Sequence, residues 1–406
     1  MSAPYADWSV LAIFIFLYTL VSDRLERTWI SEAIFFSLFG AIAGSSALGI
    51  LSFNVTSEGL KTLVELTLAL ILFTDAATVD LGALKNSVRW PIRLLGLGLP
   101  LTILLGTAIA KVIFPEFSWV EAALLSTMLA PTDAALGEAV VTNPNVPDKI
   151  RADLNVESGL NDGICVPVLF CLLAIASPSN PDQSIGTLLF SLFSQQIGIG
   201  VLVGSSFAVI GSQLQKKMAR GKWQTGAWQL VSVAALAIAC FSTSQVLGGS
   251  GFIASFTGGL IFGNAANSVK DELLSSAEAA GDTLSLLTWV AFGSVGLGLI
   301  TTDLTWQIVL YAALSLTIIR ILPVVLCLFG TLLNLPSKLF MGWFGPRGLA
   351  SIVFAVIVLD ANLGASKPIV TTVIATIILS VIAHGLTANP LSKLYAKQQD
   401  NRSQDE

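Results

Sequence analysis

The stretch Glu157-Ser158-Gly159-Leu160-Asn161-Asp162 lies near the start of a segment that is otherwise apolar and runs on to about Ala176. On a helix, Ser158 and Asp162 share one stripe, and Glu157 and Asn161 share the neighbouring stripe. Ionisable groups at membrane depth are costly and usually mark a functional site. The stretch therefore predicts a membrane-spanning helix whose polar face holds a small cation or a proton. A polar face buried against other helices for structural reasons is the alternative.

The composition of the chain indicates a membrane protein. Hydrophobic residues make up 54% of the 406 residues, and Asp, Glu, Lys and Arg only 12%, whereas soluble domains carry about 25% charged residues. Apolar runs of roughly 17–25 residues are typical of membrane-crossing helices and exclude a β-barrel, whose short segments alternate. The four cysteines fall inside apolar runs and form no CxxC pair. This favours small buried hydrophobes over a metal or disulfide framework.

Thirteen apolar runs define an all-α polytopic membrane protein, with residues 1–393 as one transmembrane domain. Six runs precede the seventh and six follow it, which is typical of two inverted six-helix repeats with discontinuous crossing helices. The repeats are placed at about 8–177 and 226–390, joined by a linker helix at about 186–211 and a basic loop at 212–225. The tail, 394–406, is expected to be short, cytoplasmic and disordered. The predicted spans are 8–22, 29–51, 60–80, 92–114, 119–140, 153–177, 186–211, 226–247, 249–264, 283–301, 305–330, 342–360 and 366–390.

Basic residues divide unevenly between the two sides that these spans define. Sixteen Lys and Arg residues lie in alternate loops and in the C-terminal tail on one side, whereas only Lys61, Lys111 and Lys367 lie on the other. By the positive-inside rule, the N-terminus is outside and the C-terminus is in the cytoplasm. The two remaining basic residues, Arg320 and Arg347, fall within or at the edge of a span.

Prolines interrupt the fifth and the twelfth spans. The fifth contains Ala130-Pro131-Thr132-Asp133-Ala134 near its middle, and the twelfth contains Phe344-Gly345-Pro346-Arg347-Gly348 nearer its start. Because proline removes a backbone donor and clashes with the preceding turn, Pro131 and Pro346 should break their helices. Paired breaks in corresponding elements of two repeats indicate a transport site.

At such breaks, freed carbonyl groups can coordinate a cation, and Asp133 can face the positive end of the following half-helix. Arg347 would then offset the carbonyl ends of the broken helices. A simple proline kink capped by Asp133, and a loop arginine at the membrane surface, are the alternatives.

Further polar residues lie within apolar runs. Arg320 needs a partner, and Glu157 is the natural candidate, alone or shared with Arg347, unless Arg320 reaches the interface. A paired Glu157 would stay ionised, which leaves Asp162 to exchange a proton. Asp75, in the third span, faces either the site or a water-filled vestibule. His384, the single histidine, is either a pH sensor or a satisfied packing residue.

The motifs Pro131-Thr132-Asp133, Glu157 to Asp162 and Gly345-Pro346-Arg347-Gly348, in this order, resemble those of the NhaP-type sodium/proton antiporters of the monovalent cation:proton antiporter superfamily. The resemblance covers nearly the whole chain. It implies an NhaA/NhaP-like fold and a homodimer, with a dimer domain and a six-helix transport core. It further implies a prokaryotic inner-membrane protein that needs no cofactor.

The resemblance also implies roles for single residues. Asp162 and Asp133 would bind Na⁺ with Ser158 and the backbone of Thr132, with Asp75 as a further contributor. Glu157 resembles the acid that pairs with an arginine, here Arg320 or Arg347, and Asn161 resembles the asparagine of electroneutral members. Ala134 stands where a second proline is frequent, and Asp75 stands where a glutamate is common.

The expected function is secondary active transport, not enzymatic catalysis or nucleic-acid binding. One Na⁺ (or Li⁺) would exchange for one H⁺ by alternating access, with cation and proton competing for Asp162. A K⁺/H⁺ antiporter of the same fold is the main alternative. A cation channel and an intramembrane aspartyl protease that uses Asp133 and Asp162 are remote alternatives.

Overall fold

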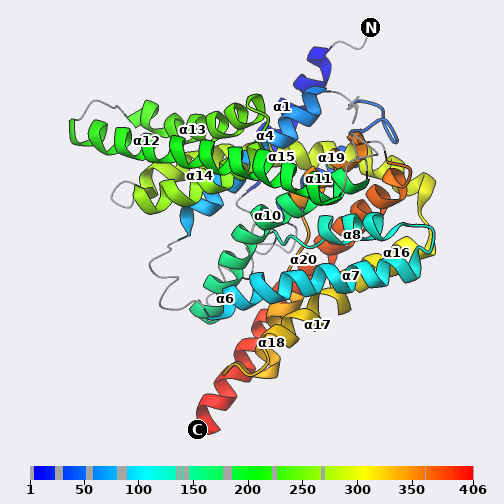
Figure 1. Ribbon diagram of the computed structural model, residues 1–406. Coiled ribbons are helices and arrows are strands. Elements are labelled where there is room, and N and C mark those ends of the chain that lie inside the picture. Colours follow the sequence, from blue (N-terminus) through cyan, green and yellow to red (C-terminus); the bar gives the residue numbers. More distant parts are fainter. Residues whose placement is uncertain are drawn as a thin grey trace.

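The computed structural model describes residues 4–22, 31–51, 58–79, 89–133, 136, 140, 146–176, 185–221, 226–266, 270–361 and 363–405. Within these ranges the regular secondary structure is helical throughout (Figure 1). The helices of the first half are α1 (Pro4–Thr19), α3 (Glu32–Ala43), α4 (Glu58–Thr78), α6 (Arg89–Arg93), α7 (Leu99–Ile113), α8 (Trp119–Met128), α10 (Asp148–Ala176), α11 (Ile185–Leu192) and α12 (Gly200–Gly221). Those of the second half are α13 (Gly226–Val246), α14 (Gly251–Ala265), α15 (Lys270–Asp303), α16 (Trp306–Leu316), α17 (Ile318–Cys327), α18 (Leu335–Trp343), α19 (Leu349–Asp360) and α20 (Ser366–Asp405). Short π-helical turns, η1 (Leu94–Gly98) and η2 (Phe193–Ile199), join α6 to α7 and α11 to α12.

The prediction of an all-α polytopic membrane protein is confirmed. Each of the thirteen predicted spans coincides with at least one helix of the described chain, and six continuous helical segments are long and apolar enough to cross a membrane by length and composition. Apolar side chains such as Leu104 and Val112 of α7 are exposed. A lipid-facing surface tolerates such exposure, whereas monomeric soluble proteins rarely expose large apolar patches.

Three predicted boundaries are wrong. The twelfth span begins at Leu335 instead of residue 342, because Asn334 caps α18 by accepting from the backbone N–H of Ser337 at 2.8 Å. The tail is not disordered, since α20 continues to Asp405 and Tyr395 stacks on Phe340 at 4.5 Å between ring centroids. The basic connector at 212–225 is shorter than expected, because α12 remains helical to Gly221, and residues 222–225 lie outside the described ranges.

The helices form two groups. In the first group α12 packs on α14, α14 on α4, and α3 and α4 on α15, around buried side chains that include Phe73 and Phe262. Figure 1 shows α12, α13 and α14 together on one side of the molecule. The second group contains α7, α8, α10 and α16 to α20. Helix α10 carries the polar stretch and contacts both groups, because it packs against α4 and α14 as well as α8 and α19.

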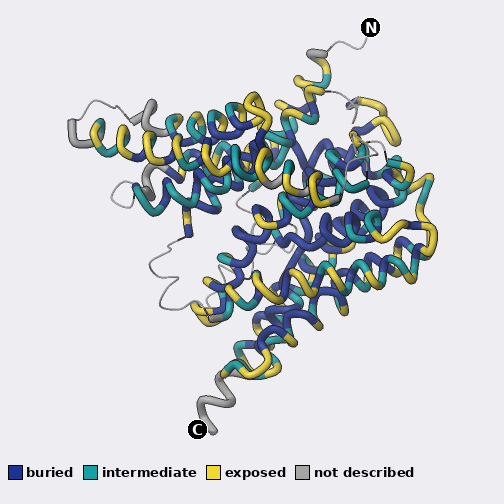
Figure 2. Tube along the Cα trace, viewed as in Figure 1, coloured by how far each residue is buried: buried dark blue, intermediate teal, exposed yellow. Residues whose placement is uncertain are grey.

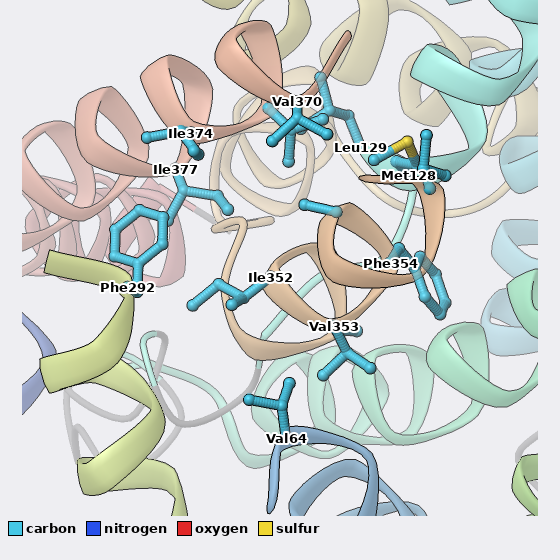
Figure 3. Close-up of a cluster of buried hydrophobic side chains, with 14 of the residues drawn as sticks. Val64, Met128, Leu129, Phe292, Ile352, Val353, Phe354, Val370, Ile374 and Ile377 are labelled. Atoms are coloured by element: carbon cyan, nitrogen blue, oxygen red, sulfur yellow. The ribbon is translucent and has the colours of Figure 1, made fainter. Parts of the chain in front are cut away.

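The half-helix α19 lies at the centre of the main hydrophobic core. Ile352, Val353 and Phe354 of α19 point in different directions, and all three are buried. Figure 3 shows them surrounded by side chains from α4, α8, α15 and α20. The buried residues in Figure 2 concentrate in the same region, where α19 packs against α20 and also contacts α10. A half-helix that is apolar on all sides can start inside the membrane only if its polar end finds partners, and that end lies at the twelfth-span break.

Candidate functional site

The two predicted breaks meet. Helix α8 ends at Met128 and α18 ends at Trp343, and both are followed by non-helical backbone. The backbone N–H of Asp133 donates to the carbonyl oxygen of Pro346 at 2.8 Å. A Cβ atom at Gly345 would collide with Arg320, and one at Gly348 would collide with the carboxylate of Asp133. The glycines of the twelfth-span motif therefore allow the two non-helical segments to cross in direct contact. Most of the fifth span after Asp133 lies outside the described residues.

Residues of the second break satisfy carbonyl groups freed at the first. The guanidinium Nη1 of Arg347 donates to the carbonyl oxygens of Ala130 and Pro131, at 2.9 and 3.0 Å. The hydroxyl of Ser351 donates to the carbonyl of Met128 at 2.7 Å. Unpaired carbonyls in a buried site would cost free energy, and a cation next to the carbonyl end of a helix is favourable. Arg347 thus donates to carbonyls at the C-terminal end of α8.

Helix α10 holds the first break at Thr132 through its polar face. Ser158 donates its hydroxyl to the carbonyl oxygen of Thr132 at 2.5 Å. The side-chain oxygen of Asn161 accepts from the backbone N–H of Thr132 at 3.2 Å, and its amide nitrogen donates to the Thr132 hydroxyl at 2.7 Å. Asn161 therefore has a structural task in addition to its lack of charge, because it fixes both the backbone and the side chain of Thr132.

Glu157 and Arg320 form a buried ion pair. Nη1 and Nη2 of Arg320 donate to Oε1 and Oε2 of Glu157, at 2.7 and 2.8 Å, and both side chains are only 3% exposed. A bidentate pair of this kind joins α17 to α10 with a defined geometry. The structure therefore selects Arg320 over Arg347 as the partner of Glu157.

The carboxylate of Asp133 accepts hydrogen bonds from two helical or turn segments. Its Oδ1 accepts from the backbone N–H of Leu136 at 3.2 Å, and its Oδ2 accepts from the N–H of Leu349, the first residue of α19, at 2.9 Å. The sequence predicted that Asp133 faces the positive end of the half-helix that follows it. The shorter of these two hydrogen bonds comes instead from Leu349, at the start of α19 in the other repeat. An anion at a helix N-terminus is stabilised by the unpaired N–H groups and by the helix dipole.

Asp162 differs from the other acids of the site. It is buried, and its Oδ1 atom has no hydrogen-bond partner among the described residues. Asp133 and Asp75 lie close enough for their charges to act on it. Asp75 belongs to α4 and lies beside Gly159 of α10, so the side chain faces the polar stretch and not a remote surface. A buried carboxylate oxygen without a partner is expensive unless a proton or a cation occupies it.

Sequence reasoning missed two contributors to this site. Ser351 is a single hydroxyl inside the apolar α19, and only its three-residue distance from Gly348 could have pointed to it. Ser380 of α20 accepts from the backbone N–H of Arg347 at 2.7 Å. His384 is buried and hydrogen-bonded through both ring nitrogens, as a satisfied packing histidine would be.

The chain is similar to known exchangers and antiporters over most of its length. The family model described as the transmembrane sodium/hydrogen exchanger matches residues 10–394. The K(+)/H(+) antiporter NhaP2 of Shewanella oneidensis is 26% identical over 92% of this chain and 64% of its own length. The Na(+)/H(+) antiporter 2 of Zygosaccharomyces rouxii is 26% identical over 88% of this chain and 46% of its own length. The chain thus spans less than two thirds of these curated relatives.

A solved structure shares the fold. The structure of the sodium proton antiporter MjNhaP1 from Methanocaldococcus jannaschii at pH 8 superposes with a TM-score of 0.75 at 22% identity, covering 96% of this chain and 98% of that one. Because the identity is only 22%, this comparison shows a shared fold and no more.

Proposed function

Because the chain belongs to the sodium/hydrogen exchanger family, we propose that it is a secondary transporter that exchanges Na⁺ for H⁺ across a membrane. The observation that carries the proposal is the carboxylate of Asp162, which is buried and has an Oδ1 without a hydrogen-bond partner among the described residues. It lies one helical turn after Ser158, whose hydroxyl contacts the broken segment at Thr132. Oxygen groups of this kind are what a hard cation requires.

In the proposed mechanism, one site binds either ion. With Asp162 ionised, the site is negative and binds Na⁺ with oxygens from Ser158, Thr132 and Asp133, with Asp75 close by. With Asp162 protonated, the negative charge is gone and Na⁺ leaves. Either loaded state can change its access from one side to the other, whereas the empty, charged state is expensive to move through an apolar environment. Exchange follows because the protein crosses only when one ion has replaced the other.

The contacts of the neighbouring residues support a ratio of one H⁺ to one Na⁺. Glu157 is neutralised by Arg320, so it contributes no exchangeable charge. Asn161 is uncharged and engaged with Thr132. Asp133 accepts from two backbone N–H groups, which favour its ionised form throughout. Of the two acids that remain, Asp75 and Asp162, it is Asp162 that has a buried oxygen without a partner among the described residues, so we assign the exchangeable proton to Asp162, and the exchange is electroneutral. The cycle requires no cofactor besides the transported ions.

A K⁺/H⁺ antiporter is the second candidate. The Shewanella relatives are named K(+)/H(+) antiporters, whereas the yeast relative is named a Na(+)/H(+) antiporter. Carboxylate, hydroxyl and carbonyl oxygens serve either ion, because selectivity among hard cations depends on cavity size, ligand number and flexibility.

The proposal extends to assembly and location. The chain is an integral membrane protein. We place it as a homodimer in a prokaryotic inner membrane, with the N-terminus outside and the C-terminus in the cytoplasm. The basic-residue asymmetry supports this orientation, although several of those residues, such as Arg24 and Lys85, lie outside the described ranges.

The test is cation-driven proton movement in proteoliposomes that contain a pH-sensitive dye. Addition of Na⁺, Li⁺, K⁺ or choline to separate samples should produce a saturable pH change with Na⁺ and Li⁺ and none with choline. A response to K⁺ that exceeds the response to Na⁺ would favour the second candidate. A flux that rises without saturation and without counter-movement of protons would contradict a carrier and indicate a channel.

A further inference from the structure

The second break, like the first, is held by a helix that runs beside it. Helix α20 places the imidazole of His384 at the end of α18, where Nε2 lies 2.8 Å from the carbonyl oxygen of Trp343. One turn earlier on α20, the hydroxyl oxygen of Ser380 lies 2.7 Å from the backbone nitrogen of Arg347. Trp343 is the last residue of α18, and Arg347 lies two residues before the start of α19. Helix α20 therefore contacts the non-helical segment near both of its ends.

Both ring nitrogens of His384 lie 2.8 Å from a carbonyl oxygen, Nε2 from that of Trp343 and Nδ1 from that of Ser380, and a carbonyl can only accept. We assign the proton of the neutral ring to Nε2, because Nδ1 can then accept from the hydroxyl of Ser380. The Arg347 N–H can only donate, so the oxygen of Ser380 must accept. The other ring nitrogen, Nδ1, contacts Ser380, at 3.1 Å from its hydroxyl and 2.8 Å from its carbonyl oxygen. Neutral and charged imidazole thus share the same donor at Nε2. The side chains of Ser380 and His384 are buried, and so is Arg347, so water does not replace Ser380 at the N–H of Arg347.

The hydrogen bonds from α10 to the first break and from α20 to the second come from corresponding helices of the two repeats. Helix α10 is the sixth predicted span and α20 the thirteenth, and each follows a broken span directly. On α10, a hydroxyl and an amide three residues apart hold Thr132. On α20, a hydroxyl and an imidazole four residues apart hold Arg347 and Trp343. In each repeat, a pair of polar side chains thus forms hydrogen bonds with the broken segment that precedes its helix.

We propose that His384, through Nε2, and Ser380 are positioning residues for the cation site, an inference that rests on the transport function proposed above. The segment that they hold carries the Pro346 carbonyl, which accepts from the N–H of Asp133, and it leads to the Leu349 N–H, which donates to the Asp133 carboxylate. A shift of this segment moves both contacts of Asp133. His384 therefore acts on cation binding at a distance, through the backbone, and not as an ion ligand or a titrating sensor.

The experiment compares two substitutions of His384 whose side chains differ in length. In His384→Gln the terminal amide nitrogen can still donate to Trp343, whereas in His384→Asn the shorter side chain cannot reach it. His384→Asn should raise the apparent KM for the cation about threefold to tenfold, as expected for the loss of one of the two hydrogen bonds to the Trp343 carbonyl, which keeps the N–H of Gly345. The change in maximal rate should be smaller. His384→Gln should keep a KM near that of the unmodified protein. Thr376→Val is the matched control, because among the described residues this buried hydroxyl of α20 donates to the carbonyl of Thr372 in its own helix.

Two results in proteoliposomes would overturn the inference. One is an apparent KM for His384→Asn equal to that of the unmodified protein. The other is a pH profile of exchange displaced in His384→Gln, which would show that titration of the imidazole matters. Failure of the unmodified protein to exchange any cation would instead defeat the proposed transport function.

A measurement without transport tests the same geometry. Because His384 is the single histidine, ¹⁵N-histidine labelling of protein purified without a histidine tag gives one pair of ring signals. Nε2 should be protonated both below and above neutral pH. A neutral ring with its proton on Nδ1 would contradict the proposed contact with Trp343, whatever the transport assays show.

Discussion

Removal of the charge of Glu157 should destabilise the protein far more than loss of an exposed ion pair. In Glu157→Gln, the guanidinium of Arg320 stays buried without its counter-charge, and both side chains are 3% exposed in the intact pair. Breaking a buried pair on one side costs about 3–5 kcal/mol. The comparison pair, Lys61 and Asp360, has side chains 35% and 60% exposed. Solvent screens it, so Lys61→Gln should cost about 0.2–1 kcal/mol.

Equilibrium unfolding of the purified protein in mixed micelles, followed by circular dichroism, measures both costs. The double variant Glu157→Gln/Arg320→Gln removes both buried charges and should recover part of the stability that the single change loses. Equal stability of Glu157→Gln and Lys61→Gln would refute the reasoning, because it would mean that the Arg320 charge is compensated elsewhere or reached by water.

Three further substitutions test the geometry of the site. Asn161→Asp adds a second carboxylate beside Thr132, so an imposed membrane potential should displace the steady-state ion distribution, which it should leave unchanged in the unmodified protein. Gly348→Ala should abolish exchange because the new Cβ would overlap the Asp133 carboxylate, whereas Gly59→Ala, which has open space around its Cβ, should be silent in the same flux assay. Ser158→Ala leaves the Thr132 carbonyl without its donor and should raise the apparent KM for Na⁺ about tenfold, the effect of one lost buried hydrogen bond; an unchanged KM would remove Ser158 from the site.

The breaks were predictable in part, because proline disfavours a continuous helix and both α8 and α18 end close to Pro131 and Pro346. Proline alone does not decide the matter, since Pro167, Pro323 and Pro390 lie inside helices. The choice between Arg320 and Arg347 as the partner of Glu157 was not predictable. Both arginines lie in or beside apolar runs, and only the three-dimensional crossing brings Arg347 to the carbonyl end of α8.

The hydrogen-bond donors of Asp133 show a second limit of prediction from the sequence. Sequence reasoning placed the positive end of the following half-helix near this carboxylate, which is a local inference. The N–H of Leu349 comes from a residue 216 positions away, and this contact depends on the register at which the two repeats cross. Likewise, the paired roles of Ser158 and Ser380 become visible only when each hydroxyl is seen next to its backbone partner.

In the proposed mechanism, cation and proton compete for Asp162. The most direct test of this competition is the number of protons released when Na⁺ binds to purified protein in a weakly buffered solution, recorded by a pH indicator during titration. About one proton should be released per bound Na⁺ from the unmodified protein and from Asp75→Asn, and none from Asp162→Asn. Proton release that persists in Asp162→Asn would contradict competition at Asp162 and assign the exchange to another group.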